Sequence, residues 1–171
     1  MFVEISVRPN GIAVINLNRP EKGNAFNEST LTSFNEALDQ IDQNPLIRLV
    51  IIEGQGKNFC TGADLQWMQQ FCQRDREDNL DHAKRMEHLF RRLYEMRPPM
   101  IASVHGKVFG GGLGLIACCD AVIAHPDTLF CFSELRLGLI PAVISPYVVL
   151  KIGYSQARYF MLSTKTFSAA D

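Results

Sequence analysis

Two short runs near the N-terminus alternate between apolar and polar residues, as strands do when one face is buried. The runs FVEISV (2–7) and IAVINL (12–17) flank the sequence Pro9-Asn10-Gly11. Asn and Gly both accept positive φ, so an Asn-Gly pair between two alternating runs predicts a β-hairpin that turns at residues 9–11.

A spacing of three and four residues between apolar positions predicts two longer amphipathic helices. The first covers residues 29–43 and ends at Asn44-Pro45, because proline cannot continue a helix. The second covers residues 74–96 and ends before Pro98-Pro99, and its many charges are interpreted as a solvated face.

Continuous apolar runs predict buried strands at residues 49–53, 100–104 and 121–125. Shorter helices are predicted at 65–72, at 114–119, and as a pair within 142–163. The last residues, 164–171, have the character of a helix cap. Strands alternate with helices along the whole chain, so the sequence predicts a single α/β domain over residues 1–171.

The composition excludes several classes of protein. Apolar residues make up 47% of the chain and the net charge is −1, which argues against a nucleic-acid or anionic-membrane binder. No apolar run reaches the roughly 18 residues of a membrane span, and the N-terminus lacks the basic start of a signal peptide. The five cysteines form no CxxC pair and, with the four histidines, no metal-ligand spacing. We therefore expect reduced thiols, a cytoplasmic location and no bound metal.

Three consecutive glycines, Gly110 to Gly112, stand immediately before an apolar run. They are compatible with a tight turn that packs closely on its neighbours. Residues 112–117 also match the G-x-G-x-x-A pattern of dinucleotide loops, but no strand runs directly into them, and no Lys-Ser/Thr follows as in a P-loop. A third interpretation is an oxyanion site, because glycines before a helix leave backbone N–H groups bare. The loop FCTGAD (59–64) also joins an apolar strand to a helix and offers a second donor.

Five ordered blocks of sequence carry a resemblance to a known family. They are RPEKGNAF (19–26), FCTGADL (59–65), PPMIASVHGKVFGGGLGL (98–115), CDAVIA (119–124) and FSELRLGLIP (132–141). Together they resemble the enoyl-CoA hydratase/isomerase, or crotonase, family in order and spacing. Within it, the chain is similar to bacterial methylglutaconyl-CoA hydratases.

The resemblance implies a fold, a ligand and an assembly. The expected fold is a right-handed spiral of ββα units whose C-terminal helical region is missing or truncated here. The expected ligand is an acyl-CoA thioester, with no cofactor apart from the coenzyme A of the substrate. A full-length chain would form a homotrimer or a dimer of trimers.

The resemblance also assigns residues to the chemistry. The amides of Ala63 and Gly111 would hold the thioester oxygen, so that side chains at 110–112 would block the substrate. Glu134 matches one of the two glutamates of the best-known hydratases, whereas Gly114 stands where the other would be. Its apolar neighbours Phe130, Phe132 and Leu135 are expected to raise the pKa of Glu134 by desolvation.

Further contacts with the substrate are expected from residues of the matched blocks. Lys22 could meet a phosphate or ribose of coenzyme A, or could be a solvated lysine. Asp64 could border the substrate or cap the following helix. The set of expected substrate-binding residues is Lys22, Ala25, Asp64, Leu65, Gly110 and Gly114.

These assignments predict hydration of a trans-2-enoyl-CoA, with a branched or carboxylated acyl group such as methylglutaconyl, in fatty acid or branched amino acid catabolism. One carboxylate also suffices for proton transfer between two carbons, so a Δ3,Δ2-enoyl-CoA isomerase is an alternative. A fragment that binds CoA without catalysis is a further alternative.

Overall fold

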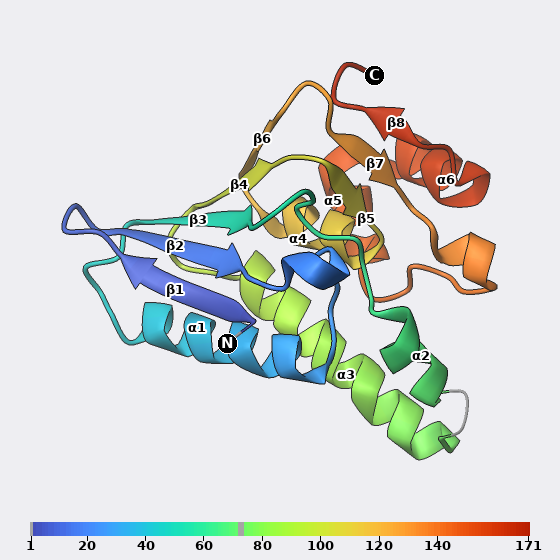
Figure 1. Ribbon diagram of the computed structural model, residues 1–171, viewed down its shortest axis with the longest axis horizontal. Coiled ribbons are helices and arrows are strands. Elements are labelled where there is room, and N and C mark those ends of the chain that lie inside the picture. The colour runs from blue at the N-terminus through green and yellow to red at the C-terminus, as the bar shows by residue number, and fades with distance from the viewer. Residues whose placement is uncertain (1, 72–73) are drawn as a thin grey trace.

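The predicted hairpin forms one edge of a five-stranded sheet in the computed structural model, which describes residues 2–71 and 74–171 (Figure 1). The strand order is β1-β2-β3-β4-β6. β1 is antiparallel to β2, and every other neighbouring pair is parallel. The strands are β1 (Val3–Val7), β2 (Ile12–Leu17), β3 (Leu49–Gly54), β4 (Met100–Val104) and β6 (Ala121–Ala124).

A second, smaller sheet has the order β5-β7-β8 and was not predicted from the sequence. Its strands are β5 (Lys107–Phe109), β7 (Leu129–Cys131) and β8 (Phe167–Ser168). β5 and β7 are parallel, and β8 is antiparallel to β7. Strands of two or three residues are too short to display alternation. The predicted helix-cap character of 164–171 is confirmed at Thr164, which caps α6, whereas the strand β8 further along the segment was not predicted.

The α-helices occur where the sequence predicts them, with boundaries that differ by up to three residues. They are α1 (Glu28–Asp42), α2 (Leu65–Phe71), α3 (Arg76–Tyr94), α4 (Gly111–Cys118), α5 (Ser145–Ile152) and α6 (Tyr154–Ser163), with two short 3₁₀ helices, η1 (Pro20–Lys22) and η2 (Glu134–Leu137). The sequence predicts a start of α4 at residue 114, but the helix begins at Gly111, so part of the glycine run is helical.

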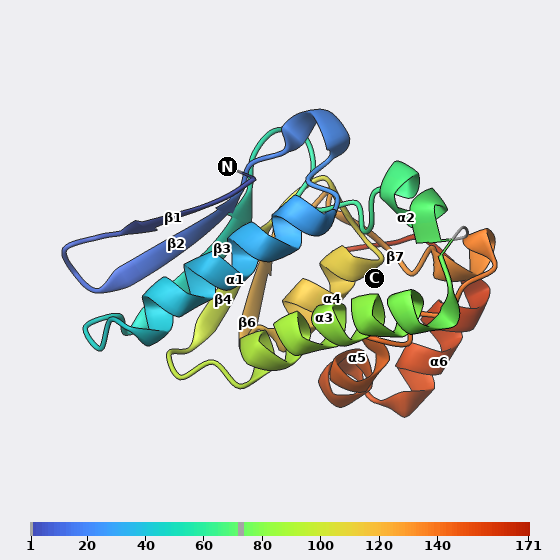
Figure 2. The ribbon, with the colours of Figure 1, turned by 90° about the horizontal axis from the view of Figure 1, so that it is seen from below.

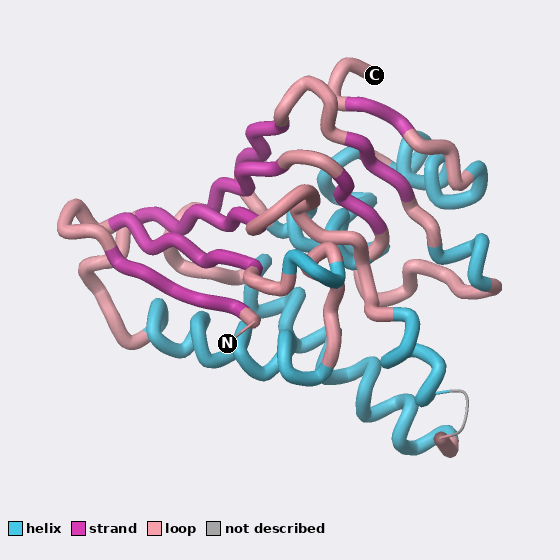
Figure 3. Tube along the Cα trace, in the orientation of Figure 1, coloured by secondary structure: helices cyan, strands magenta, loops and turns pink. Residues whose placement is uncertain are grey.

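Helices cover one face of the larger sheet. α1 and α3 lie side by side along it, and α4 lies between the sheet and α5 (Figures 2 and 3). Phe34 of α1 and Phe90 of α3 are fully buried between these layers. No helix in the described ranges is both long enough and apolar enough to cross a membrane.

The predicted buried, reduced thiols are confirmed for the cysteines that the structure describes. Cys60, Cys118, Cys119 and Cys131 are free and buried. Burial raises the pKa of the Cys60 and Cys119 thiols to about 12, so both are protonated at neutral pH. Cys72 lies outside the described residues. The four described thiols are therefore core side chains, and burial leaves Cys60, Cys118 and Cys119 with little thiolate character.

Candidate active site

Three parallel segments of backbone, at Cys60, β5 and β7, lie next to one another and end at the same place. Cys60 pairs with Val108 of β5, and β5 pairs with β7. The Phe109 amide donates to the Cys60 carbonyl at 2.9 Å, and the Gly110 amide donates to the Cys131 carbonyl at 3.0 Å. The loops that follow these segments therefore emerge side by side, as loops do at the carboxyl ends of parallel strands.

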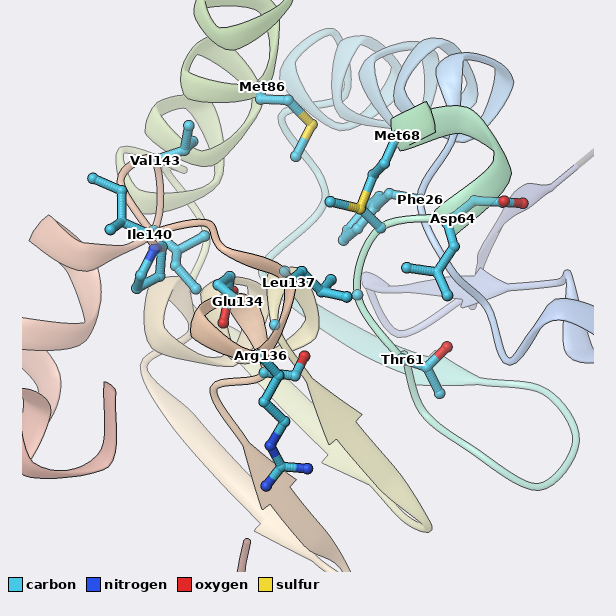
Figure 4. A pocket seen from close by; sticks show the side chains of 18 of the residues that line it. Phe26, Thr61, Asp64, Met68, Met86, Glu134, Arg136, Leu137, Ile140 and Val143 are labelled. Carbon is cyan, nitrogen blue, oxygen red and sulfur yellow. The ribbon is translucent and has the colours of Figure 1, made fainter. Parts of the chain in front are cut away.

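A pocket of about 730 Å³ opens where these loops emerge. Ala63, Gly111 and Glu134 all line it, one from each loop. In Figure 4, Met68 and Met86 point into it from α2 and α3, and Ile140 and Val143 form the facing wall. Thr61 and Arg136 lie on the other side of Glu134. The pocket thus has an apolar end and a more polar end, with Glu134 between them.

The backbone around Ala63 directs its amide toward the glycine loop. The Phe26 amide donates to the Gly62 carbonyl at 2.7 Å, and the Asp64 amide donates to the Phe26 carbonyl at 2.8 Å. Because successive residues of an extended segment point their polar groups to opposite sides, the Ala63 N–H faces away from Phe26. A side chain on Gly62 would lie 3.6 Å from the Gly111 nitrogen, so the two loops are in close contact.

The Gly111 amide is available because it starts a helix. The first N–H groups of a helix have no partner within it and carry the positive end of its dipole. Within residues 2–71 and 74–171, neither the Ala63 amide nor the Gly111 amide has a hydrogen-bond acceptor in the protein. The two unpaired donors line one pocket, which is the arrangement that an oxygen gaining negative charge requires.

Close packing between segments explains the three glycines, as one of the interpretations of the sequence predicts. A Cβ on Gly112 would lie 2.6 Å from the Cys60 carbonyl oxygen, beneath the pocket and away from a substrate. A Cβ on Gly111 would meet the Phe26 ring at 3.1 Å, and one on Gly110 would meet the Glu134 Oε1 atom at 3.2 Å. Close packing between the segments therefore accounts for the run, together with the positive φ of 49° at Gly110.

Glu134 begins η2 and directs its carboxylate into the pocket. Its Oε2 atom is buried and has no hydrogen-bond partner. Burial raises the pKa of this carboxyl above its ordinary value, which confirms the direction predicted from the sequence. Of the apolar neighbours that were expected to bury it, Phe130 and Phe132 are buried, whereas Leu135 is 46% exposed.

The position of the second family glutamate has no room for a side chain. A Cβ on Gly114 would lie 2.3 Å from the Cγ2 atom of Ile144 and 2.8 Å from Cε1 of Phe90. Gly114 is buried in α4 and lies outside the pocket lining. Ile144, whose importance the sequence does not reveal, occupies the space that a carboxylate at 114 would need.

The residues that were expected to bind coenzyme A lie partly in the pocket wall and partly in the core. Lys22 lines the pocket and donates to the side chain of Gln66 at 3.3 Å. Leu65 and Gly110 also line it, whereas Ala25 is buried and its carbonyl accepts a hydrogen bond from Arg19. Ala25 and Gly114 are therefore the two expected substrate contacts that the fold does not bring to the pocket wall.

Asp64 caps α2 and pairs with a residue that sequence reasoning missed. Its Oδ1 atom accepts from the Gln66 amide at 2.9 Å, and its Oδ2 atom lies 2.7 Å from Arg19. Burial alone would raise the pKa of Asp64, but the Arg19 guanidinium and the helix amides outweigh it and lower the pKa. Asp64 does line the pocket, but its hydrogen bonds are used to join the two loops.

Replacing Arg19 with methionine is expected to lower the free energy of unfolding by about 3–5 kcal/mol, because Asp64 would keep a buried and unpaired charge. The lowered pKa means that the pair stabilises the fold above the unfolded pKa of about 3.9 and loses this contribution as pH falls through the folded value. Urea unfolding from pH 7 to pH 2 would measure both effects. Arg8→Met, at an exposed arginine, is the matched control, and equal losses in both variants would contradict the prediction.

No group of three or more His, Cys, Asp or Glu side chains within the described ranges could hold a metal ion. The ionisable side chains in the pocket lining are Lys22, Asp64, Glu134 and Arg136. Since Asp64 is paired with Arg19, Glu134 is the carboxylate in the lining that is free to exchange protons with a ligand.

Two free amides and one buried carboxylate in a pocket define a class of site that polarises a carbonyl and moves a proton. A family model described as enoyl-CoA hydratase/isomerase matches residues 7–171, and this chain belongs to that family. The crystal structure of an enoyl-CoA hydratase from Shewanella pealeana superimposes with a TM-score of 0.96 at 39% identity, over 99% of this chain and 64% of that one. This likeness confirms the predicted crotonase fold.

Two curated relatives differ in the reactions that their names state. Crotonyl-CoA hydratase of Syntrophomonas wolfei is 35% identical over 131 residues, which are 76% of this chain and 49% of that protein. The peroxisomal Delta(3,5)-Delta(2,4)-dienoyl-CoA isomerase of Arabidopsis thaliana is 31% identical over 169 residues, which are 91% of this chain and 59% of that protein. The chain therefore spans about half to two thirds of the length of the proteins it matches.

Proposed function

We propose that this site hydrates a 2-enoyl-CoA thioester. The observation that carries the proposal is the convergence of two amides without acceptors, Ala63 and Gly111, with the buried carboxylate of Glu134 in one pocket. Binding the thioester oxygen between the two amides would stabilise the enolate that forms when the double bond is attacked. Loss of one such donor typically costs about 2.7–4 kcal/mol of transition-state stabilisation.

A single carboxylate can carry out the complete proton transfer. Glu134 would accept a proton from water while the water oxygen bonds to the β-carbon and the π electrons move to the thioester oxygen. The same carboxyl would then return its proton to the α-carbon as the enolate collapses, so atoms and charge balance. The raised pKa of Glu134 suits this double role, because a group that gives and takes a proton works best when its pKa is near the operating pH.

The polarity of the pocket supports an orientation and a substrate class. Lys22 and its neighbour Gln66 would face the charged part of coenzyme A. The acyl group would lie beyond Glu134, between Met68 and Met86. Arg136 lies on the other side of Glu134, and the Lys22 ammonium bonds Gln66, so a carboxylate on the acyl group would lose its hydration without gaining a partner. We therefore favour an uncharged acyl group over a carboxylated one.

Isomerisation of a 3-enoyl-CoA is the second candidate, and the packing at Gly114 favours it. Ile144 and Phe90 exclude a second carboxylate, and a 1,3-proton transfer needs only one base. In this reaction Glu134 would remove a proton from the α-carbon and return it to the γ-carbon. The enolate between these steps would use the same pair of amides.

A direct assay separates the candidates. Purified protein is expected to consume crotonyl-CoA with loss of the absorbance of the conjugated thioester, because hydration removes the double bond. Incubation with trans-3-hexenoyl-CoA tests the isomerase, since conjugation then increases the same absorbance. Binding of CoA esters with neither change would contradict both reactions and leave a CoA-binding protein.

A further inference from the structure

The carboxylate of Glu134 has no side-chain partner that fixes its direction. Its Oε2 atom lacks a hydrogen bond, and the hydrogen bonds at this residue are made by its backbone. The Leu139 amide, for example, donates to the Glu134 carbonyl at 3.1 Å. The position of the carboxylate in the pocket therefore depends on where the short helix η2 lies.

One side chain ties η2 to the rest of the protein. The Arg136 Nε atom donates to the hydroxyl of Thr164 at 3.2 Å, and its Nη2 atom donates to the Thr164 carbonyl. Within the described residues, these are the side-chain hydrogen bonds that η2 makes. Leu135 and Leu137, on either side of Arg136, are 46% and 50% exposed, so apolar packing holds this helix weakly.

Thr164 provides a fixed attachment point. It ends α6 in the left-handed conformation, with φ of 50°, and its carbonyl also accepts from the Cys131 thiol at 3.4 Å. The carbonyls at a helix C-terminus carry partial negative charge, which favours a guanidinium there. The segment from β7 to η2 is thus joined to the end of α6 at both Cys131 and Arg136.

We propose that Arg136 is a positioning residue that holds the Glu134 carboxylate in the pocket by fixing η2 to the C-terminus of α6. This inference rests on the proposed function, in which Glu134 transfers the proton. Arg136 acts through the backbone of η2, because its guanidinium donates to Thr164 and makes no hydrogen bond to Glu134.

The state of Glu134 without substrate provides the first test. Carbon-13 NMR titration of the glutamate carboxyls, with the Glu134 signal assigned by its loss in E134Q, would follow Glu134 in the parent and in R136Q. If the Glu134 carboxylate leaves its place in the pocket, water reaches it. Its pKa is then expected to fall toward the ~4.3 of an exposed glutamate. Loss of the arginine charge alone would instead raise that pKa. Lys22 and Asp64, the other ionisable groups of the lining, are unchanged in the variant.

Two outcomes of this titration would overturn the inference, namely an unchanged or a raised pKa of Glu134 in R136Q. R158Q is the matched control, since Arg158 is exposed and bonds Tyr154 within α6. T164G removes the hydroxyl acceptor while easing the left-handed backbone, so this variant is expected to fold. T164G should lower the pKa of Glu134 by less than R136Q does. Adding T164G to R136Q should cause no further change in that pKa.

Kinetics with the consumed enoyl-CoA provide the second test. R136Q is expected to lower kcat about tenfold or more with KM within about threefold, because displacement of a reacting group lowers the rate of the chemical step. R136K should recover part of kcat. A rise in KM with constant kcat would instead make Arg136 a substrate-binding residue and overturn the proposal. If the parent is inactive on every enoyl-CoA, the proposed function fails, and the substrate-free titration still decides the role of Arg136.

Discussion

Glu134→Gln is expected to lower kcat by about 10²–10⁴-fold, the usual contribution of general acid–base catalysis. The amide keeps the shape of the side chain but cannot take a proton from water or return one to carbon. Binding of the CoA ester should change little, because the proposed contacts of the thioester oxygen are with the backbone amides of Ala63 and Gly111, which line the pocket and are unchanged in the variant. Steady-state rates and calorimetric titration with the substrate would measure the two effects.

The same variant is expected to be more stable than the parent at neutral pH. Burial raises the pKa of Glu134, so the contribution of this one group to stability is fully present below the unfolded pKa of about 4.3 and is lost as pH rises through the folded value. Glutamine does not ionise and avoids this loss. Glu36→Gln, on an exposed face of α1, is the control. Full activity in Glu134→Gln would remove this residue from the mechanism.

Gly114→Glu is expected to lower the free energy of unfolding by about 3 kcal/mol or more, although it restores the carboxylate that related hydratases carry. The new Cβ would lie 2.3 Å from Ile144 Cγ2, and overpacking of this kind displaces neighbouring side chains. The carboxylate would also be buried without a partner. We expect no gain in hydration, as measured by urea unfolding and by the crotonyl-CoA assay.

Two further variants test the cause of that loss. Gly138→Ala is a control with no atom within 4 Å of the new Cβ, so only the cost of a left-handed alanine, about 1–2 kcal/mol, is expected. Ile144→Ala should make room at residue 114, so that Gly114→Glu costs less in its background than alone. Equal costs of Gly114→Glu in both backgrounds would mean that Ile144 does not block the position.

The local pattern of apolar and polar residues was sufficient to predict most of the helices and strands. Asn10-Gly11 between alternating runs predicted the hairpin, and the apolar spacing predicted α1 and α3. The pattern failed in two places where tertiary contacts decide. The short strands β5, β7 and β8 form through pairing between segments far apart in sequence, and Leu80, an apolar residue of α3, is 53% exposed.

The sequence by itself determined the family and predicted Ala63, Gly111 and Glu134 as the site residues, because its ordered motifs resemble those of a known fold. Only the tertiary structure decided how these residues meet and what surrounds them. The Arg19–Asp64 pair, the Ile144 side chain at Gly114 and the Arg136–Thr164 tie all join residues far apart in sequence. Such contacts depend on how the layers pack, and packing leaves no periodic signal along a single chain.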